Sequence, residues 1–214
     1  MTVYELSNHV SILSVCVPFV TGLILFKKID ANSRVLVLLL FFATLAQLST
    51  YSNRSEEFYN LYTVLDPLFW GYIFFRNSRN KWIRSFIVVT ACLQPIVSLS
   101  RFDKVGLSDQ FYSQLVCINN LLLLLWVVSF FYERYYTDHI YSLEREPLFW
   151  FCLGILFYAP GSYFYFAFQE NLAVETSAKI TAMHDLLNTA QYLIFAFGIY
   201  INLKRNVRYQ NAFS

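Results

Sequence analysis

The residues of this sequence that could take part in chemistry are a few polar side chains embedded in long apolar segments. Near the C-terminus, six residues follow one another at alternating spacings of four and three, namely His184, Asn188, Gln191, Phe195, Gly198 and Asn202. This spacing places them on one face of a helix. The first half of this stripe, from His184 to Gln191, is polar. This predicts either a ligand pocket or a face that holds neighbouring helices by hydrogen bonds. The second half carries Phe195 and the small Gly198, which favours close helix packing.

Asp66 is the second candidate, because a carboxylate near the middle of a membrane is expected to be protonated, paired or functional. Tyr62 lies one turn before Asp66 on the same predicted helix. The expected partners of Asp66 are His184 or hydroxyl and amide groups. The alternative is a neutral Asp66 that donates a hydrogen bond.

The elements that must position these residues are apolar helices. Of the 214 residues, 57% are hydrophobic and 14% are charged, against about 25% charged in a soluble domain. A bilayer core about 30 Å thick needs about 20 residues of helix. The sequence therefore predicts an all-α polytopic membrane protein, with residues 1–214 forming a single domain of seven transmembrane helices. The predicted spans are 6–26, 35–51, 58–75, 82–99, 115–132, 147–168 and 182–203, followed by a short tail.

The basic residues are distributed unevenly between the two sides of this predicted bundle. The richer side holds Lys27, Lys28, Arg34, Arg76, Arg79, Lys81, Arg84, Arg134, Arg145, Lys204, Arg205 and Arg208. The other side holds Arg54, Arg101, Lys104 and Lys179. Because positive residues stay cytoplasmic, the sequence predicts an external N-terminus and a cytoplasmic C-terminus.

With this orientation, the polar residues gather in the outer half of the bundle. The candidate ligand-pocket residues are Tyr62, Asp66, Gln94, Asn119, Asn120, Ser162, His184, Asp185, Asn188 and Gln191. The inner segments Val35–Phe42, Leu121–Val128 and Leu193–Phe197 offer almost no polar side chain. The pattern predicts a cavity that opens to the exterior and is closed toward the cytoplasm.

Prolines within the spans predict local distortions, because each removes a hydrogen bond of its helix. The strongest predicted break is at Pro160 and Gly161, which we take as hinge candidates in the sixth span. Pro18, Pro67 and Pro95 are further sites of expected kinks.

Several chemistries are excluded by what the sequence lacks. The last span has no lysine inside the membrane for a retinal Schiff base. The only histidines are His9, His139 and His184, and a single His–Asp pair cannot complete a catalytic zinc site with three protein ligands. We therefore predict no catalytic residue, no bound metal or cofactor, and no binding of nucleic acid. The four cysteines lie inside spans and predict no disulfide.

The last two spans resemble those of a family of small, largely uncharacterised bacterial seven-helix membrane proteins. The resemblance is carried by residues 147–150, 157–162, 183–188 and 194–200. Some of those proteins are associated with two-component histidine kinases, which implies a sensory or regulatory role in a bacterial cytoplasmic membrane.

The function expected from these observations is a receptor-like membrane sensor. It would bind an apolar or amphipathic ligand in the outer pocket and signal through a partner protein at the cytoplasmic loops. The alternatives are a transporter or channel for a small molecule or ion, a membrane assembly subunit, and a membrane-embedded enzyme.

Overall fold

The structure, a computed structural model, describes residues 3–49, 55–105, 113–137, 143–168 and 174–212. Throughout this part of the chain the only regular elements are helices, and no strand is present. They are α1 (Val3–Ser14), α2 (Cys16–Ile24), α3 (Ala31–Ser49), α4 (Ser55–Asn77), α5 (Lys81–Val105), α6 (Ser113–Thr137), the short 3-10 helix η1 (Leu143–Arg145), α7 (Pro147–Phe168) and α8 (Val174–Ala212). Arg54, His139 and Tyr51 lie outside the described residues.

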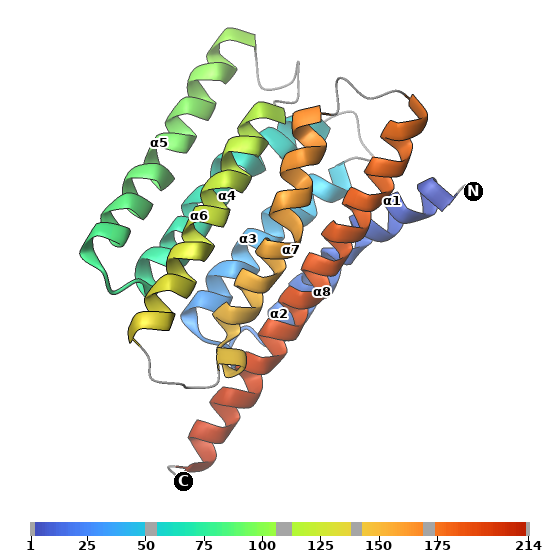
Figure 1. The fold of residues 1–214 in the computed structure, drawn as a ribbon. Coiled ribbons are helices and arrows are strands. Elements are labelled where there is room, and N and C mark those ends of the chain that lie inside the picture. The colour runs from blue at the N-terminus through green and yellow to red at the C-terminus, as the bar shows by residue number, and fades with distance from the viewer. Residues whose placement is uncertain (1–2, 50–54, 106–112, 138–142, 169–173, 213–214) are drawn as a thin grey trace.

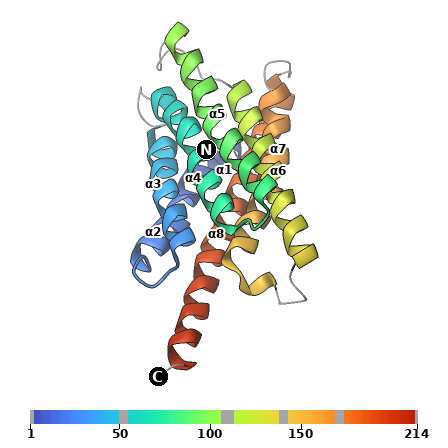
Figure 2. The same ribbon diagram turned by 90° about the vertical axis from the view of Figure 1, so that its left-hand side faces the viewer.

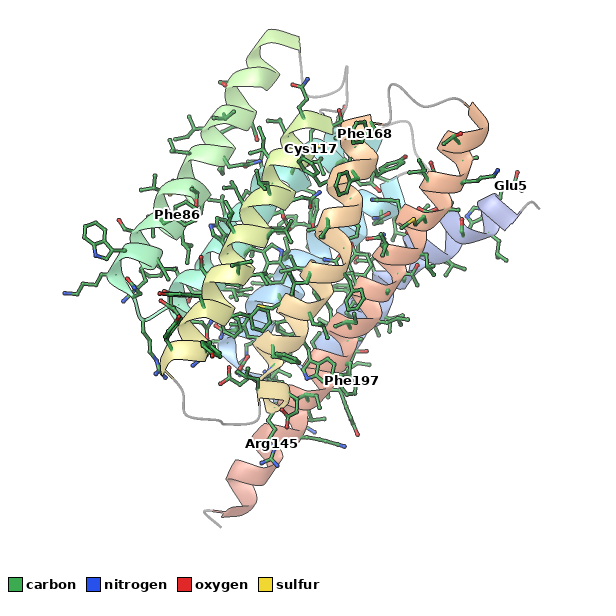
Figure 3. All side chains as sticks on the ribbon, viewed as in Figure 1. Glu5, Phe86, Cys117, Arg145, Phe168 and Phe197 are labelled. Atoms are coloured by element: carbon green, nitrogen blue, oxygen red, sulfur yellow. The ribbon has the colours of Figure 1, made fainter. Side chains whose placement is uncertain are left out.

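The helices form a bundle in which α1 and α2 follow one another in the same direction, and the long helices from α3 to α8 alternate in direction (Figure 1). The N-terminal pair α1 and α2, then α3, α4, α6, α7 and α8 contact one another in this order and close a ring. Helix α5 packs outside the ring against α4 and α6 (Figures 1 and 2). Figure 3 places Cys117 and Phe168 toward one end of the bundle and Arg145 at the other. We call these the Phe168 end and the Arg145 end.

Six segments of the described chain are long and apolar enough to cross a membrane, which supports a multi-pass membrane protein. They are Glu5–Ile24, Ala31–Ser49, Lys81–Ser100, Ser113–Tyr136, Pro147–Phe168 and Ala178–Lys204. The remaining predicted span, 58–75, is helical and lies within the 23 residues of α4. It is not among the six because its polar residues lower its hydropathy. Three of them, Asn60, Thr63 and Asp66, are buried inside the bundle.

The first predicted span, 6–26, is divided into two helices, although Glu5–Ile24 as a whole is long and apolar enough to cross a membrane. Helix α1 ends at Ser14 and α2 begins at Cys16. Pro18 lies in the first turn of α2, where its ring removes the bond that Ser14 would accept and crowds that carbonyl. At the same point the Ser14 hydroxyl donates to the Ser11 carbonyl oxygen, 2.6 Å away. The kink expected from Pro18 is therefore present, one turn before the proline.

The sixth predicted span has the bounds of α7, Pro147–Phe168, but the break expected at Pro160 is absent. Helix α7 continues through Pro160 and Gly161. A Cβ atom on Gly161 would collide with Leu187 of α8, so this glycine permits a close helix approach. A hinge motion at Pro160 and Gly161 stays a prediction.

The last helix is longer than the predicted span 182–203. Helix α8 begins at Val174 and continues to Ala212, so the predicted tail is almost entirely helical. Its C-terminal part projects beyond the Arg145 end of the bundle (Figures 1 and 2). Helix α8 thus connects the interior of the bundle to the space beyond that end.

A layer of buried aromatic rings crosses the middle of the bundle, and we call it the aromatic floor. It consists of Trp70, Phe74, Trp126, Phe151 and Phe195, each at most 5% exposed. The Trp70 and Phe195 ring centroids are 5.7 Å apart, and the Phe74 and Trp126 centroids are 6.1 Å apart. Phe151 meets Phe195 edge to face at 5.8 Å. Such tilted and edge-to-face contacts are favourable for aromatic pairs, so the floor is a packed barrier.

Candidate functional site

A cavity of about 390 Å³ lies inside the ring, on the Phe168 side of the aromatic floor. Its described walls come from α1, α3, α4, α6, α7 and α8, whereas α5 contributes none. Eight of the ten candidate pocket residues line it: Tyr62, Asp66, Asn119, Asn120, His184, Asp185, Asn188 and Gln191. The volume falls within the range of about 300–1,000 Å³ that is typical of small-molecule pockets.

Asp66 accepts hydrogen bonds from a hydroxyl and an amide, and the Trp70 side chain also bonds to its carboxyl group. The Tyr62 hydroxyl, one turn earlier on α4, donates to Asp66 Oδ1 at 2.9 Å. Asn119 Nδ2 of α6 donates to Asp66 Oδ2 at 2.5 Å. The expected class of partner is therefore present, and these bonds do not involve His184. Asn119 Oδ1 is left without a hydrogen-bond partner.

The α8 stripe faces the interior of the bundle along its whole length. His184, Asn188, Gln191 and Phe195 line the cavity. Gly198 packs against Phe151 below it. Asn202, further down, donates from Nδ2 to Ser33 Oγ at 2.6 Å and accepts from the Asp30 backbone N–H at 3.2 Å. The polar residues of the stripe therefore line the cavity or join helices, and a ligand-binding role stays a prediction.

Side-chain hydrogen bonds around the cavity join five pairs of neighbouring helices in the ring. They are Tyr59 to Gln47 (α4 and α3, 2.9 Å), Asn119 to Asp66 (α6 and α4, 2.5 Å), Asn120 to Ser162 (α6 and α7, 3.0 Å), Tyr158 to His184 (α7 and α8, 3.3 Å), and Asn188 to Ser11 (α8 and α1, 2.9 Å). Because these bonds lie at or beside the wall, a molecule that displaces one partner would alter the contact between two helices.

His184 lies in an aromatic cage toward the Phe168 end. Its ring stacks on Tyr165 with centroids 4.5 Å apart and an interplanar angle of 24°. The Tyr158 hydroxyl is 3.3 Å from Nε2, and Asp185 Oδ1 is 4.0 Å from Nδ1. Asp185 also accepts from the Ser7 hydroxyl at 3.3 Å. This group of side chains can hold polar atoms of a ligand and orient the imidazole.

Ser162 and Gln94 are the two candidates that do not line the cavity. Ser162 is fully buried behind the wall, where its hydroxyl accepts the bond from Asn120. Gln94 belongs to α5, which lies outside the ring. Its side chain is 3% exposed, and neither its amide nitrogen nor its carbonyl oxygen has a hydrogen-bond partner.

Replacing Gln94 by methionine is expected to stabilise the protein. A buried polar group without a partner costs about 1–3 kcal/mol, and methionine has a similar shape without that cost. Gln94→Met should therefore raise the melting temperature of the purified protein in detergent micelles. The matched control is Gln191→Met, which removes a polar group of the cavity wall. An unchanged or lower melting temperature for Gln94→Met would show that the amide is satisfied in the folded protein.

The wall residues that were not among the candidates include a set of aromatic side chains. Besides Tyr62, the aromatic side chains of the wall are Tyr59, Trp70, Tyr158, Tyr165, Phe166, Tyr192 and Phe195. In a chain with 22 Phe and 16 Tyr, residue type alone does not distinguish them. The missed signal is their spacing, since Tyr59, Tyr62, Asp66 and Trp70 recur every three or four residues on α4.

The described residues contain no group of three or more His, Cys, Asp or Glu side chains that could hold a metal ion. All four cysteines are free. The walls of the cavity offer hydrogen-bonding, aromatic and carboxylate groups.

Comparisons with known proteins do not place this chain in a family. A scan against protein-family models, a search of curated proteins and a search of solved structures found no match.

Proposed function

We propose that this protein is a small receptor-like sensor of a bacterial cytoplasmic membrane, which binds an apolar or amphipathic ligand and signals through a partner protein. In this proposal α4 is the seventh membrane-spanning helix. Its polar face is covered by the surrounding helices and does not meet lipid. The N-terminus and the Phe168 end lie outside the cell, and the Arg145 end with the projecting part of α8 lies in the cytoplasm.

The observation that carries the proposal is a cavity with polar walls that is closed by aromatic rings toward the Arg145 end. Its walls hold hydrogen-bonding residues from six helices, and below it the aromatic floor is buried. A transporter or channel needs a continuous polar route across the membrane. Trp70 and Phe195 close such a route between the cavity and the Arg145 end, which favours a receptor.

The proposed orientation agrees with the contacts of the basic residues at the Arg145 end. Four of them lie over aromatic rings: Arg34 over Phe26, Arg84 over Phe75, Arg134 over Phe130 and Lys204 over Tyr200. Trp82, Tyr135 and Tyr136 at this end are 70–86% exposed. Aromatic rings combined with Lys and Arg are typical of a membrane–water interface, with the basic residues on the cytoplasmic side.

A route from the cavity to the cytoplasmic loops runs along α8. The helix carries His184 and Asn188 in the wall, and two turns below Phe195 it carries Asn202, which holds the loop before α3 through Asp30. At the same end, Glu133 of α6 accepts bonds from the backbone N–H groups of Arg79 and Asn80. A ligand that binds one arrangement of α8 better than another would increase the population of that arrangement. The loops attached to α8 would change position with it.

The experiment that tests the proposal combines partner capture with a deletion. A photo-crosslinking residue is placed at Arg145, and at Met183 near the other end as the control position. We expect Arg145 to capture a protein with a signalling output, and deletion of the chain to change the set of transcripts that this partner controls. Capture of no signalling protein together with an unchanged transcript profile would overturn the proposal.

The proposed orientation predicts which surface positions are reached from outside the cell. Lys179 at the Phe168 end and Lys28 at the Arg145 end are both exposed. In intact cells, a membrane-impermeant maleimide should label Lys179→Cys above the parent protein and leave Lys28→Cys unlabelled until the cells are lysed, because the reagent cannot cross the bilayer. The reverse pattern would invert the orientation.

A further inference from the structure

We infer that the ligand of this cavity carries a protonated amine, which is held by the Asp66 carboxylate and the Asn119 carbonyl oxygen, with an apolar body against the aromatic wall. This inference rests on the proposed function and adds the chemical class of the ligand.

The hydrogen bonds leave acceptors without donors at the buried end of the cavity. Asn119 uses its amide nitrogen on Asp66 Oδ2, which leaves Asn119 Oδ1 beside the carboxylate with no partner. Asp66 is 3% exposed and Asn119 is 6% exposed. A carboxylate has about four lone-pair sites, so the bonds from Tyr62, Asn119 and Trp70 do not saturate it. A ligand that fits here must bring N–H or O–H donors, and an ammonium group brings three of them.

The charges of the wall favour a cation over a neutral donor. The described residues that line the cavity include Asp66 and Asp185 but no lysine and no arginine. A buried carboxylate without a compensating charge is costly, and an ammonium ion would compensate it. Asp66 is more deeply buried than Asp185, at 3% against 7% exposed, and it is bonded to Asn119, whose Oδ1 has no partner, so Asp66 is the better seat for the cation.

The aromatic wall suits both parts of such a ligand. Tyr62 and Trp70 flank Asp66 on α4 at one-turn spacings and line the cavity with it. Aromatic faces attract cations by about 0.5–2 kcal/mol, most strongly when the site excludes water. The remaining rings and the aliphatic residues Leu36, Leu40 and Ile155 can bury an apolar body. The cavity thus recognises an amphipathic amine.

The test uses two probes that share one apolar body, 4-phenylbutylamine and 4-phenylbutanol. Their binding to the purified full-length protein in lipid nanodiscs is measured by calorimetry. We expect the amine to bind at least about tenfold more tightly than the alcohol. Asp66→Asn should weaken the amine by about thirtyfold or more, which is the loss typical of removing one member of a buried charge pair. The same variant should change the alcohol by less than about threefold.

The controls separate the site from the net charge and from folding. Glu146→Gln removes a carboxylate that pairs with Arg134 outside the cavity, and it should leave the amine affinity unchanged. Asn119→Leu removes the unpaired acceptor and should weaken the amine with a smaller effect on the alcohol. Asp66→Asn is expected to fold, because Asn119 can turn its amide and offer Oδ1 to the new side chain.

Each outcome decides between the inference and the function on which it rests. Equal affinity for amine and alcohol, or loss of amine binding in Asp185→Asn but not in Asp66→Asn, would overturn the inference while the cavity stays a binding site. Such equality is also what a neutral Asp66 predicts. Binding of neither probe to the parent protein would count against the ligand cavity itself and thus against the proposed function.

Discussion

Gly198→Ala is expected to lower the stability of the folded bundle, although alanine is the better helix former. A Cβ atom at this position would lie 2.6 Å and 2.9 Å from two ring atoms of Phe151 and 3.0 Å from Trp150 Cβ. Phe151 is fully buried within the aromatic floor, so its ring cannot move aside. Overpacking of this kind costs about 1–3 kcal/mol, which exceeds the gain of about 1 kcal/mol in helix propensity. The measurement is the melting temperature in detergent micelles.

The matched control is Gly161→Ala, in the same pair of helices. Its new Cβ would meet only the tip of Leu187, which is partly exposed and has other rotamers available. This variant should therefore be neutral or slightly stabilising. If both variants lose stability equally, the rigidity of the floor is not the cause. A gain for Gly198→Ala would mean that α7 and α8 are not held closely together at Phe151.

The helices were largely predictable from the sequence because a membrane imposes their length and hydropathy. The bounds of α7 follow from Pro147 in its first turn and from the end of the apolar run. The break at Val15 has a local cause in Pro18. It lies about one turn before the proline because the proline ring crowds the carbonyl group of Ser14, four residues earlier. The continuity of α7 at Pro160 could not be predicted, since neighbouring helices decide whether a proline distorts a membrane helix.

The candidate site was predictable where a polar residue is rare and unpredictable where its residue type is common. Asp66 and the α8 stripe are conspicuous in apolar sequence, and both reach the wall of the cavity. Gln94 has the same appearance in sequence but belongs to α5, and which helix stays outside the ring is decided by packing. The aromatic residues of the wall could not be told apart from other aromatic residues by sequence. Only the arrangement of the helices distinguishes Tyr158, which lines the cavity, from Phe157, which is exposed on the outside of the bundle.

Ala159→Phe is expected to abolish ligand binding and signalling while the protein stays folded. Ala159 lines the cavity between α7 and the opposite wall and is fully buried. A benzyl group at this position would occupy part of the 390 Å³ into which a ligand must fit. A ring directed into the cavity meets less strain than a ring forced into a filled core. Calorimetry should show no binding of 4-phenylbutylamine or 4-phenylbutanol.

The control for Ala159→Phe is Ala167→Phe on the same helix, two turns further along. Ala167 is exposed on the surface of the bundle, so the same substitution adds volume outside the cavity and should leave binding unchanged. In cells, Ala159→Phe should reproduce the transcript profile of the deletion, because a sensor whose cavity is filled no longer responds to its ligand. Ala167→Phe should retain the parent profile. If Ala159→Phe loses binding but keeps the parent profile, the cavity binds a molecule that the signal does not require.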